Sequence, residues 1–138
     1  MAGNAPMVAD TEVLKLKVHK VIKYMKITRF EDIIAWQRAQ DLTLHIYNDF
    51  KISKDFGFRD QIQRAAVSIM NNIAEGFERG TNKDFKHFLF IAKSSCAEVR
   101  SMLYLALNLN YIHQKQFDHN YDLTIQISRL ISGFIKTL

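Results

Sequence analysis

Apolar residues recur at the spacing of an α-helix in four successive segments, and almost nothing interrupts them. One segment, residues 58–77, carries a continuous apolar face made of Phe58, Ile62, Ala65, Ala66, Ile69, Ile73 and Phe77. The 138 residues include only one proline and five glycines, which favours long helices over many short strands. A chain of this length fits one domain with one hydrophobic core. The sequence therefore predicts a single all-α domain.

The helices are bounded by recognisable start and stop signals. Thr28 with Glu31 and Thr81 with Asp84 have the spacing of capping boxes, and Gly80 suits a left-handed position after a helix. Short connections between four helices predict an antiparallel up-and-down four-helix bundle over residues 28–138. The predicted helices are 28–50, 58–77, 82–110 and 115–137. The first carries apolar positions at Ile33, Trp36, Thr43, Ile46, Tyr47 and Phe50, and the third is predicted to be the longest.

Residues 1–27 form an N-terminal extension with a different character. Its first ten residues are small, polar and unpatterned, which predicts disorder. The following stretch reads as a short basic amphipathic helix, an extra helix beyond the bundle, although its alternation also allows a strand. Either it serves as an arm on a membrane surface or nucleic acid, or it is only an extension upstream of a natural start at Met25 or a helix that packs loosely on the bundle. The second interpretation is favoured.

Most of the positive charge belongs to this extension. The net charge is +5, but residues 1–30 hold six basic and two acidic residues, whereas residues 31–138 hold 13 basic and 12 acidic residues. No apolar run reaches the roughly 18 residues needed to span a bilayer, and no secretory signal is evident. The single cysteine, Cys96, cannot form an internal disulfide, which is typical of a reducing cytoplasm. A cytoplasmic location is expected.

The third predicted helix has more apolar surface than a lone bundle needs. Residues 102–112 are apolar nearly all round, and Phe90 and Ile91 lie off the main stripe. A helix that is apolar on several sides is usually buried on several sides. This surplus predicts a subunit interface, whereas the alternative is scattered surface apolar residues.

A row of polar and small residues lines the other side of the second helix. Arg64 is expected to pair with Glu75 of a neighbouring copy or with Glu98 of the third helix. We interpret the row as a structural polar seam that fixes helix or subunit register; the alternatives are the lining of a pore or ligand groove and an ordinary solvated face. The seam residues are Arg64, Ser68, Asn72, Glu75 and Glu98, and a neighbouring stripe of small residues is formed by Ala65, Ser68, Asn72 and Gly76.

Catalytic, cofactor and metal sites are not predicted. Asp41 with His45 and Asp84 with His87 each supply two ligands at most, and the Asp118–Asp122 cluster lacks the Glu-x-x-His pairs of di-iron bundles. No glycine-rich phosphate loop or nucleophile–base spacing occurs. Cys96 falls on the core stripe and is expected to be a small buried hydrophobe. The chain is therefore not expected to be an enzyme.

Nucleic-acid binding would draw on basic residues of the second and third helices. Residues 57–100 hold seven basic and five acidic residues, so binding would be directed at the phosphate backbone and sensitive to salt. Assembly of several copies would multiply any shared basic patch. The candidate contacts are Arg59, Arg79, Lys83, Lys86, Lys93 and Arg100. The alternative is an oligomer that is purely structural or binds only proteins.

The stretch QIQRAAVSIMNNIAEGFERG, which begins at Gln61, resembles the signature of the 23S rRNA-intervening sequence protein family. The resemblance extends upstream through FEDIIAWQRAQDLTLHIY and downstream through FLFIAKSSCAEVRSML, so it covers about residues 28–135. Matching signature positions are Gln61, Arg64, Ala65, Ser68, Ile69, Asn72, Ile73, Ala74, Glu75, Gly76 and Arg79, and Trp36, Tyr47, Phe88, Leu89 and Glu98 fit the flanking pattern. So long a match at fixed spacing is specific.

The resemblance implies a non-enzymatic four-helix subunit that assembles as a ring-like homopentamer. Family members are encoded within ribosomal RNA genes or scattered through bacterial genomes. A related branch implies a basic accessory partner of a reverse transcriptase that binds RNA or DNA. This chain departs locally from the family pattern, because it lacks the proline before the second helix and reads KSSCAEV where a glycine–serine pair is common.

Overall fold

The structure is a computed structural model that describes residues 26–138. The extra helix expected within residues 11–27 lies outside the described residues except for Lys26 and Ile27, which are not helical. The described elements are η1 (Phe30–Asp32), α2 (Ile34–Phe50), α3 (Phe56–Glu78), α4 (Asn82–Asn108) and α5 (Gln114–Ile135). No strand occurs within the described part of the chain, and the prediction of an all-α fold is confirmed.

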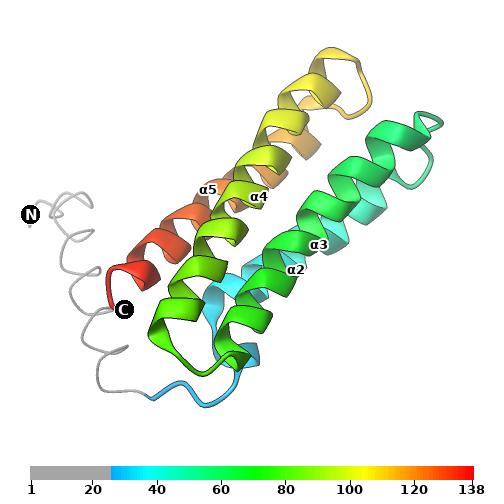
Figure 1. Cartoon of the computed structure of the whole chain (residues 1–138). Coiled ribbons are helices and arrows are strands. Elements are labelled where there is room, and N and C mark those ends of the chain that lie inside the picture. Colours follow the sequence, from blue (N-terminus) through cyan, green and yellow to red (C-terminus); the bar gives the residue numbers. More distant parts are fainter. Residues whose placement is uncertain (1–25) are drawn as a thin grey trace, which may run out of the picture.

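The four long helices pack side by side in chain order. α2 packs on α3, α3 on α4, α4 on α5, and α5 closes the ring against α2. Figure 1 shows the turns from α2 to α3 and from α4 to α5 at one end of the bundle, and the α3–α4 turn at the other. This is the predicted up-and-down bundle, and α4, with 27 residues, is the longest helix, as expected. Among the described residues, no helix is long and apolar enough to cross a bilayer.

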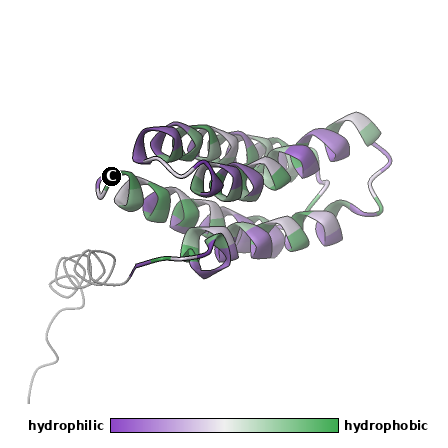
Figure 2. Cartoon of the chain, turned by 60° about the horizontal axis from the view of Figure 1, so that its bottom comes forward, coloured by the Kyte–Doolittle hydropathy of each residue, from purple (hydrophilic) through white to green (hydrophobic). Residues whose placement is uncertain are grey.

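Each helix turns one apolar stripe toward the bundle axis. In Figure 2, apolar residues (green) and polar residues (purple) alternate along each helix. These stripes follow the 3.6-residue period of the sequence, because burying apolar area is the main favourable term in folding. The fully buried large side chains come from all four helices and include Leu42, Ile46, Phe50, Ile62, Ile69, Ile73, Leu89, Val99, Leu103, Ile127 and Ile131.

Three helix starts are capped by side chains. Asp55 accepts a hydrogen bond from the Phe58 amide at 3.1 Å, and Thr81 accepts one from the Asp84 amide at 3.2 Å. His113 and Gln116 form a reciprocal capping box at the start of α5. Gly80 adopts φ +83°, so the predicted left-handed position after α3 is confirmed.

The first helix differs from its prediction at its start and along its face. The Thr28–Glu31 capping box is wrong, because the chain forms the short turn η1 and α2 begins only at Ile34, without a side-chain cap. Tyr47 was placed on the apolar face but is 46% exposed. Leu42 occupies the core instead. The buried face of α2 is rotated about the helix axis relative to the predicted apolar face.

Helices α3 and α4 approach each other closely at Gly76. A Cβ atom at this position would lie 2.5 Å from Cβ of Phe88 and 3.2 Å from Cδ1 of Phe85. Because Cβ of Phe88 is fixed to the α4 backbone, rotation of the ring cannot relieve the clash. The small-residue stripe therefore lets another helix approach α3, and that helix is α4 of the same chain.

We predict that Gly76→Ala destabilises the bundle. Overpacking costs about 1–3 kcal/mol, which outweighs the roughly 1 kcal/mol that alanine gains over glycine within a helix. Gly133→Ala in α5 is the matched control, because its added Cβ would meet no atom within 4 Å, and it should stabilise by about 0.5–1 kcal/mol. Urea unfolding measures both variants. Equal stabilisation by the two substitutions would show that α3 and α4 have room to separate.

Candidate functional site

The polar seam is partly a set of contacts inside the chain. The hydroxyl oxygens of Ser68 and Ser95 lie 2.8 Å apart and join α3 to α4. Asn72 donates to the Ser68 carbonyl at 2.8 Å and to its hydroxyl at 3.0 Å. These half-buried polar groups satisfy one another where the two helices are close, since an unsatisfied buried group would cost about 1–3 kcal/mol.

The charged members of the seam face outward. Glu98 accepts a hydrogen bond from Gln61 at 3.3 Å, rather than one from Arg64. Glu75 pairs with Arg79 at 3.3 Å along α3, where both side chains are more than half exposed. Arg64 is exposed and forms no ion pair with the described residues. The expected pairing of Arg64 with Glu98 is thus not formed within residues 26–138.

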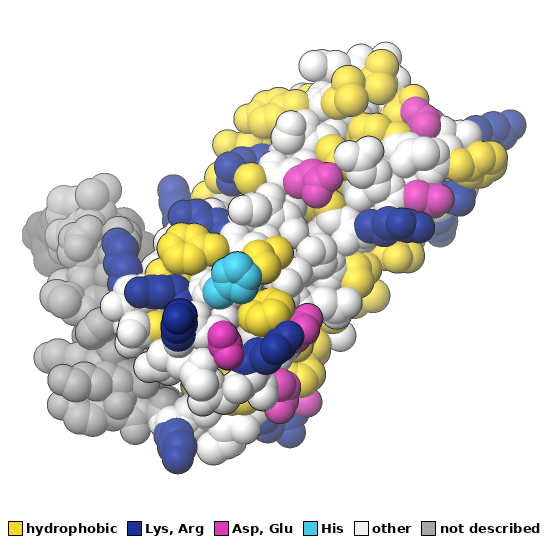
Figure 3. All heavy atoms as spheres, in the orientation of Figure 1, with side chains coloured by type: hydrophobic (Ala, Val, Ile, Leu, Met, Phe, Trp, Pro, Cys, Tyr) yellow, Lys and Arg dark blue, Asp and Glu magenta, His cyan; other side chains and the backbone are white. Residues whose placement is uncertain are grey.

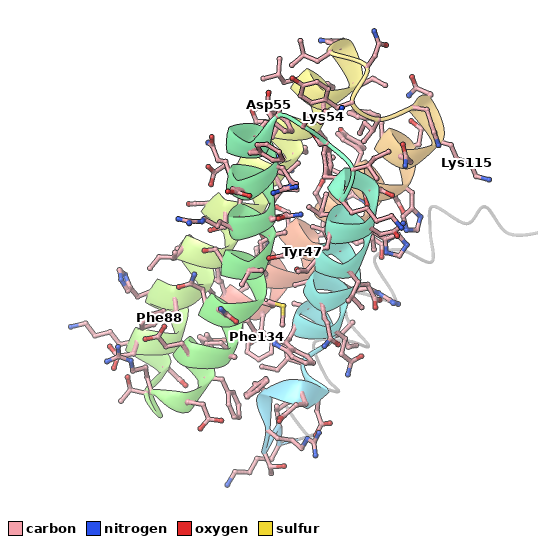
Figure 4. The ribbon with its side chains drawn as sticks, turned by 90° about the vertical axis from the view of Figure 1, so that its right-hand side faces the viewer. Tyr47, Lys54, Asp55, Phe88, Lys115 and Phe134 are labelled. Atoms are coloured by element: carbon pink, nitrogen blue, oxygen red, sulfur yellow. The ribbon has the colours of Figure 1, made fainter. Side chains whose placement is uncertain are left out.

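Two shallow grooves border Arg64. One, of about 450 Å³, runs between α3 and α4 and is also lined by Gln61 and Glu98. The other, of about 400 Å³, lies toward α2, where Tyr47 borders it together with Asn71. Figure 4 shows Tyr47 at the boundary between α2 and α3. Both grooves are wide open and are lined by Arg64 and amide groups, and the α3–α4 groove alone adds carboxylates, from Asp60 and Glu98.

The six candidate nucleic-acid contacts do not form one patch. Arg59 and Arg79 lie near opposite ends of α3, about 30 Å apart at 1.5 Å per residue. Both are engaged within the chain: Arg59 lies 3.6 Å from Asp60 and 4.8 Å above the Phe56 ring, and Arg79 covers the Phe88 ring at 5.1 Å.

Three of the remaining candidates share one side of α4. Lys86, Lys93 and Arg100, which we call the basic row, are spaced at i, i+7 and i+14 and so recur every two turns, about 10.5 Å apart. The fourth, Lys83, belongs to the first turn of the same helix. Figure 3 shows Lys and Arg side chains along the left edge of the molecule, where Figure 1 places α4 and α5.

An aromatic cluster fixes the orientation of this side of α4. The Tyr104 ring packs against Phe117 at 5.1 Å and Tyr121 at 5.9 Å, and both partners belong to α5. Arg100 lies one turn before Tyr104 and close enough that its charge opposes the upward shift of the Tyr104 pKa, which is caused mainly by the Tyr121 hydroxyl. The basic row therefore lies on the edge of α4 that faces α5.

The apolar surplus predicted for the third helix is exposed in the single chain. Ile91, Leu105 and Leu109 are 37%, 49% and 47% exposed. Together with Glu98 they form what we call the outer row, because Ile91, Glu98 and Leu105 are each seven residues apart. Glu98 borders the α3–α4 groove, so the outer row runs beside that groove, on the side of α4 away from the basic row. Other exposed apolar side chains, not anticipated from the sequence, are Ile34, Leu44, Ile52 and Phe56.

A polar clamp between α2 and α5 was also missed. Asp49 accepts hydrogen bonds from Gln116 at 3.2 Å and from the fully buried Asn120 at 2.7 Å. Nearby, the rings of His45 and His119 lie 4.3 Å apart. The amides of Gln116 and Asn120, four residues apart on α5, are the sequence signal that could have indicated it. The clamp holds α5 in register against α2.

The arrangement of the described side chains does not favour a metal site or a reactive thiol. Within residues 26–138, no group of three or more His, Cys, Asp or Glu side chains converges as metal ligands. Cys96 is fully buried and its thiol donates to the Thr124 carbonyl at 3.2 Å. Burial raises the pKa of this thiol to about 11, so its nucleophilic thiolate form is rare at neutral pH. The prediction that Cys96 is a buried hydrophobe is confirmed.

The two turns at one end of the bundle are tied by a tyrosine. Tyr111, after α4, donates its hydroxyl to Asp55 at 2.7 Å, and Asp55 in turn caps α3. Figure 4 shows Asp55 and Lys54 at this end, with Phe88 near the other. The hydrogen bonds from Tyr111 and Phe58 lower the pKa of Asp55, and the bond to Asp55 raises the pKa of Tyr111.

We predict that Tyr111→Phe lowers the melting temperature in a pH-dependent way. Because the pKa of Asp55 is lowered on folding, the bond stabilises the fold above the usual aspartate value of 3.8 and is lost as the pH falls through the lowered value. The raised pKa of Tyr111 sets the alkaline limit, above its usual value of 10.0. The control is Tyr47→Phe. Thermal melts of both variants and the wild type that coincide at neutral pH would contradict the prediction.

The fold and the α3–α4 seam define a small antiparallel four-helix-bundle protein. More particularly, the chain belongs to the 23S rRNA-intervening sequence protein family, whose model matches residues 31–133. A crystal structure of a protein of unknown function from the S23 ribosomal protein family of Bacteroides thetaiotaomicron is similar, with 26% identity and a TM-score of 0.70. The match covers 74% of this chain and 98% of that one. A search of curated proteins finds no match.

Family membership confirms the resemblance seen in the sequence. Neither comparison assigns a reaction, a ligand or a partner to this chain. The roles of the seam residues and of the basic candidates therefore rest on their geometry.

Proposed function

We propose that this chain is a non-enzymatic nucleic-acid-binding protein that works as a homo-oligomer. The observation that carries this proposal is the basic row: Lys86, Lys93 and Arg100 form a line of three cations on one edge of α4. No acidic residue interrupts this line. The residues that lie between the three cations on the same side of the helix are Phe90 and Ala97. The near-neutral total charge of the bundle conceals this local separation.

A line of cations of this kind suits a phosphate backbone. Each phosphate that is neutralised releases a condensed counterion, so affinity falls with salt in proportion to the number of contacts. A single row of three cations gives weak binding. Several copies side by side would multiply the contacts, which is why the proposal joins nucleic-acid binding to self-association.

Self-association is supported by the outer row. Ile91, Leu105 and Leu109 remain exposed beside the α3–α4 groove, where the Arg64 guanidinium is available for a carboxylate. A neighbouring copy that covers the outer row would bury apolar area and offer its own Glu75 or Glu98 to Arg64. A pentamer, as the family resemblance implies, is the assembly we expect.

The nucleic-acid arm of the proposal predicts a change in salt dependence. Lys86→Ala/Lys93→Ala should weaken RNA and DNA binding and reduce the slope of log affinity against log salt by about 1.4–1.8, or 0.7–0.9 per contact. Lys51→Ala/Lys54→Ala removes the same charge at the α2–α3 turn and should change both quantities much less. Fluorescence anisotropy at several salt concentrations measures these quantities.

A further full-length variant distinguishes nucleic-acid binding by the bundle from binding by the N-terminal extension. In it, glutamine replaces Lys15, Lys17, Lys20 and Lys23. Binding that survives these four substitutions but not the two in the basic row supports the proposal. An absence of binding at about 50 mM salt, where three contacts should still be measurable, contradicts it.

The oligomeric arm predicts that Arg64→Ala and Glu75→Ala each reduce assembly. Arg64 would lose its charge partner across the interface, and Glu75 would no longer offer its carboxylate to a neighbour. Arg38→Ala, which removes an exposed α2 cation paired with Asp41, is the control. Size-exclusion chromatography with light scattering should give a wild-type mass about five times the 16.1 kDa of one chain. A 16.1 kDa wild type, or two variants of unchanged size and melting temperature, would refute the seam interface.

The proposed function includes the role of accessory partner to a nucleic-acid enzyme such as a reverse transcriptase. The second candidate is an oligomer that is purely structural or binds only proteins. The exposed Leu44, Ile52 and Phe56, 64%, 83% and 60% accessible, favour it because they lie on α2, its following turn and the start of α3, away from the basic row. Full-size assembly without any nucleic-acid binding would select this candidate.

A further inference from the structure

The edge of α4 that carries the basic row also carries aromatic rings. Phe90 and Tyr104 follow Lys86 and Arg100, respectively, by four residues. The complete edge therefore reads Lys86, Phe90, Lys93, Ala97, Arg100 and Tyr104, with alternating steps of four and three residues. This spacing keeps all six positions on one side of the helix.

Both rings present aromatic surface to solvent. Phe90 is 51% exposed and Tyr104 is 50% exposed. Tyr104 is held from behind by Phe117 and Tyr121, which stack on each other at 5.5 Å with an interplanar angle of 21°. A ring that is fixed in place loses little side-chain entropy when a second ring stacks on it.

The facing edge of α5 adds no negative charge from Tyr121 onward, and Asp118, three residues before Tyr121, is the one acidic residue at its N-terminal end. From Tyr121, the positions at i+4, i+7 and i+11 are Ile125, Ser128 and Ser132. The backbone of Ser128 lies within hydrogen-bonding reach of Cys96 on α4, which places this line of α5 against that helix. A polyanion lying along the α4–α5 boundary would thus meet cations, hydroxyls and rings, with Asp118 as the one acidic side chain at the end of the α5 line.

We propose that the α4–α5 edge binds single-stranded nucleic acid, with bases stacking on Phe90 and Tyr104 and phosphates lying near the basic row. This inference rests on the proposed function and specifies its ligand. A surface on which cations alternate with exposed aromatic rings is suited to single strands. The cations contact phosphates and the rings stack on base faces, which a duplex hides.

The dimensions of the edge suit a short oligonucleotide. The two rings are 14 residues apart, or about 21 Å along α4, which corresponds to about six nucleotides if the strand keeps the roughly 3.4 Å per nucleotide that it has in a duplex. Neighbouring cations are about 10.5 Å apart, or about three nucleotides. One chain would therefore contact a segment of about six nucleotides.

A second copy of the chain fits this edge less well. If two copies met through it, Lys86, Lys93 and Arg100 of each would come together at positions that apolar residues occupy in helix–helix seams. Like charges so placed are destabilising. The outer row, with three apolar residues and Glu98, is better suited to self-association.

The test compares single-stranded and duplex probes with full-length protein. In fluorescence anisotropy, the protein should bind 12-nucleotide oligouridine and oligothymidine more tightly than a 12-base-pair duplex at the same probe concentration. Phe90→Leu and Tyr104→Leu should each weaken single-strand binding by about 5-fold to 100-fold and leave the salt slope and duplex affinity unchanged. Phe56→Leu, which removes an equally exposed ring near Arg59, should have no effect.

The outcomes separate this inference from the proposed function. Equal affinity for single strands and duplexes, with no effect of Phe90→Leu or Tyr104→Leu, overturns the stacking inference and leaves backbone binding intact. No binding to any probe at about 50 mM salt refutes both. Light scattering and circular dichroism check assembly and folding. If the two variants lose assembly instead of affinity, the edge is a subunit contact and the inference is wrong.

Discussion

The close packing of α3 on α4 determines which side chains of both helices reach the surface. It requires a residue without Cβ at Gly76, and it brings Ser68 within 2.8 Å of Ser95. Because this contact turns the small residues of α3 inward, Arg64 must lie on the outside, where it borders both grooves. The same contact fixes the rotation of α4, so its outer row faces solvent beside α3 while its basic row lies toward α5.

The fold could be predicted from the sequence because its signals are local and repeated. The apolar stripe of α3 and the caps at Thr81 and Gly80 lie as expected. Prediction was poorer where the signal was weak or ambiguous. The first helix starts six residues later than expected, because Thr28 precedes the turn η1 instead of capping α2. A threonine–glutamate spacing alone does not distinguish these two arrangements.

The candidate site was less accessible to sequence reasoning, because charge was counted along the chain rather than around it. Summed over residues 57–100, the basic and acidic residues nearly cancel. In the folded chain, Glu75 and Arg79 neutralise each other on α3, while Lys93 and Arg100 share a separate edge of α4. The spacing of Gln116 and Asn120 indicates two amides on one face of α5, but their partner, Asp49, depends on the rotation and register of α2, which that spacing does not determine.

The enclosure of Cys96 gives the chain an internal reporter of its own opening. Its sulfur is sealed between α4 and α5 and carries a proton over the whole physiological range, since its pKa is about 11. A thiol-specific reagent therefore reaches it only in molecules whose helices have parted. The rate of alkylation in native buffer is governed by how often the helices open locally. It would be slower in any assembly that holds α4 and α5 together.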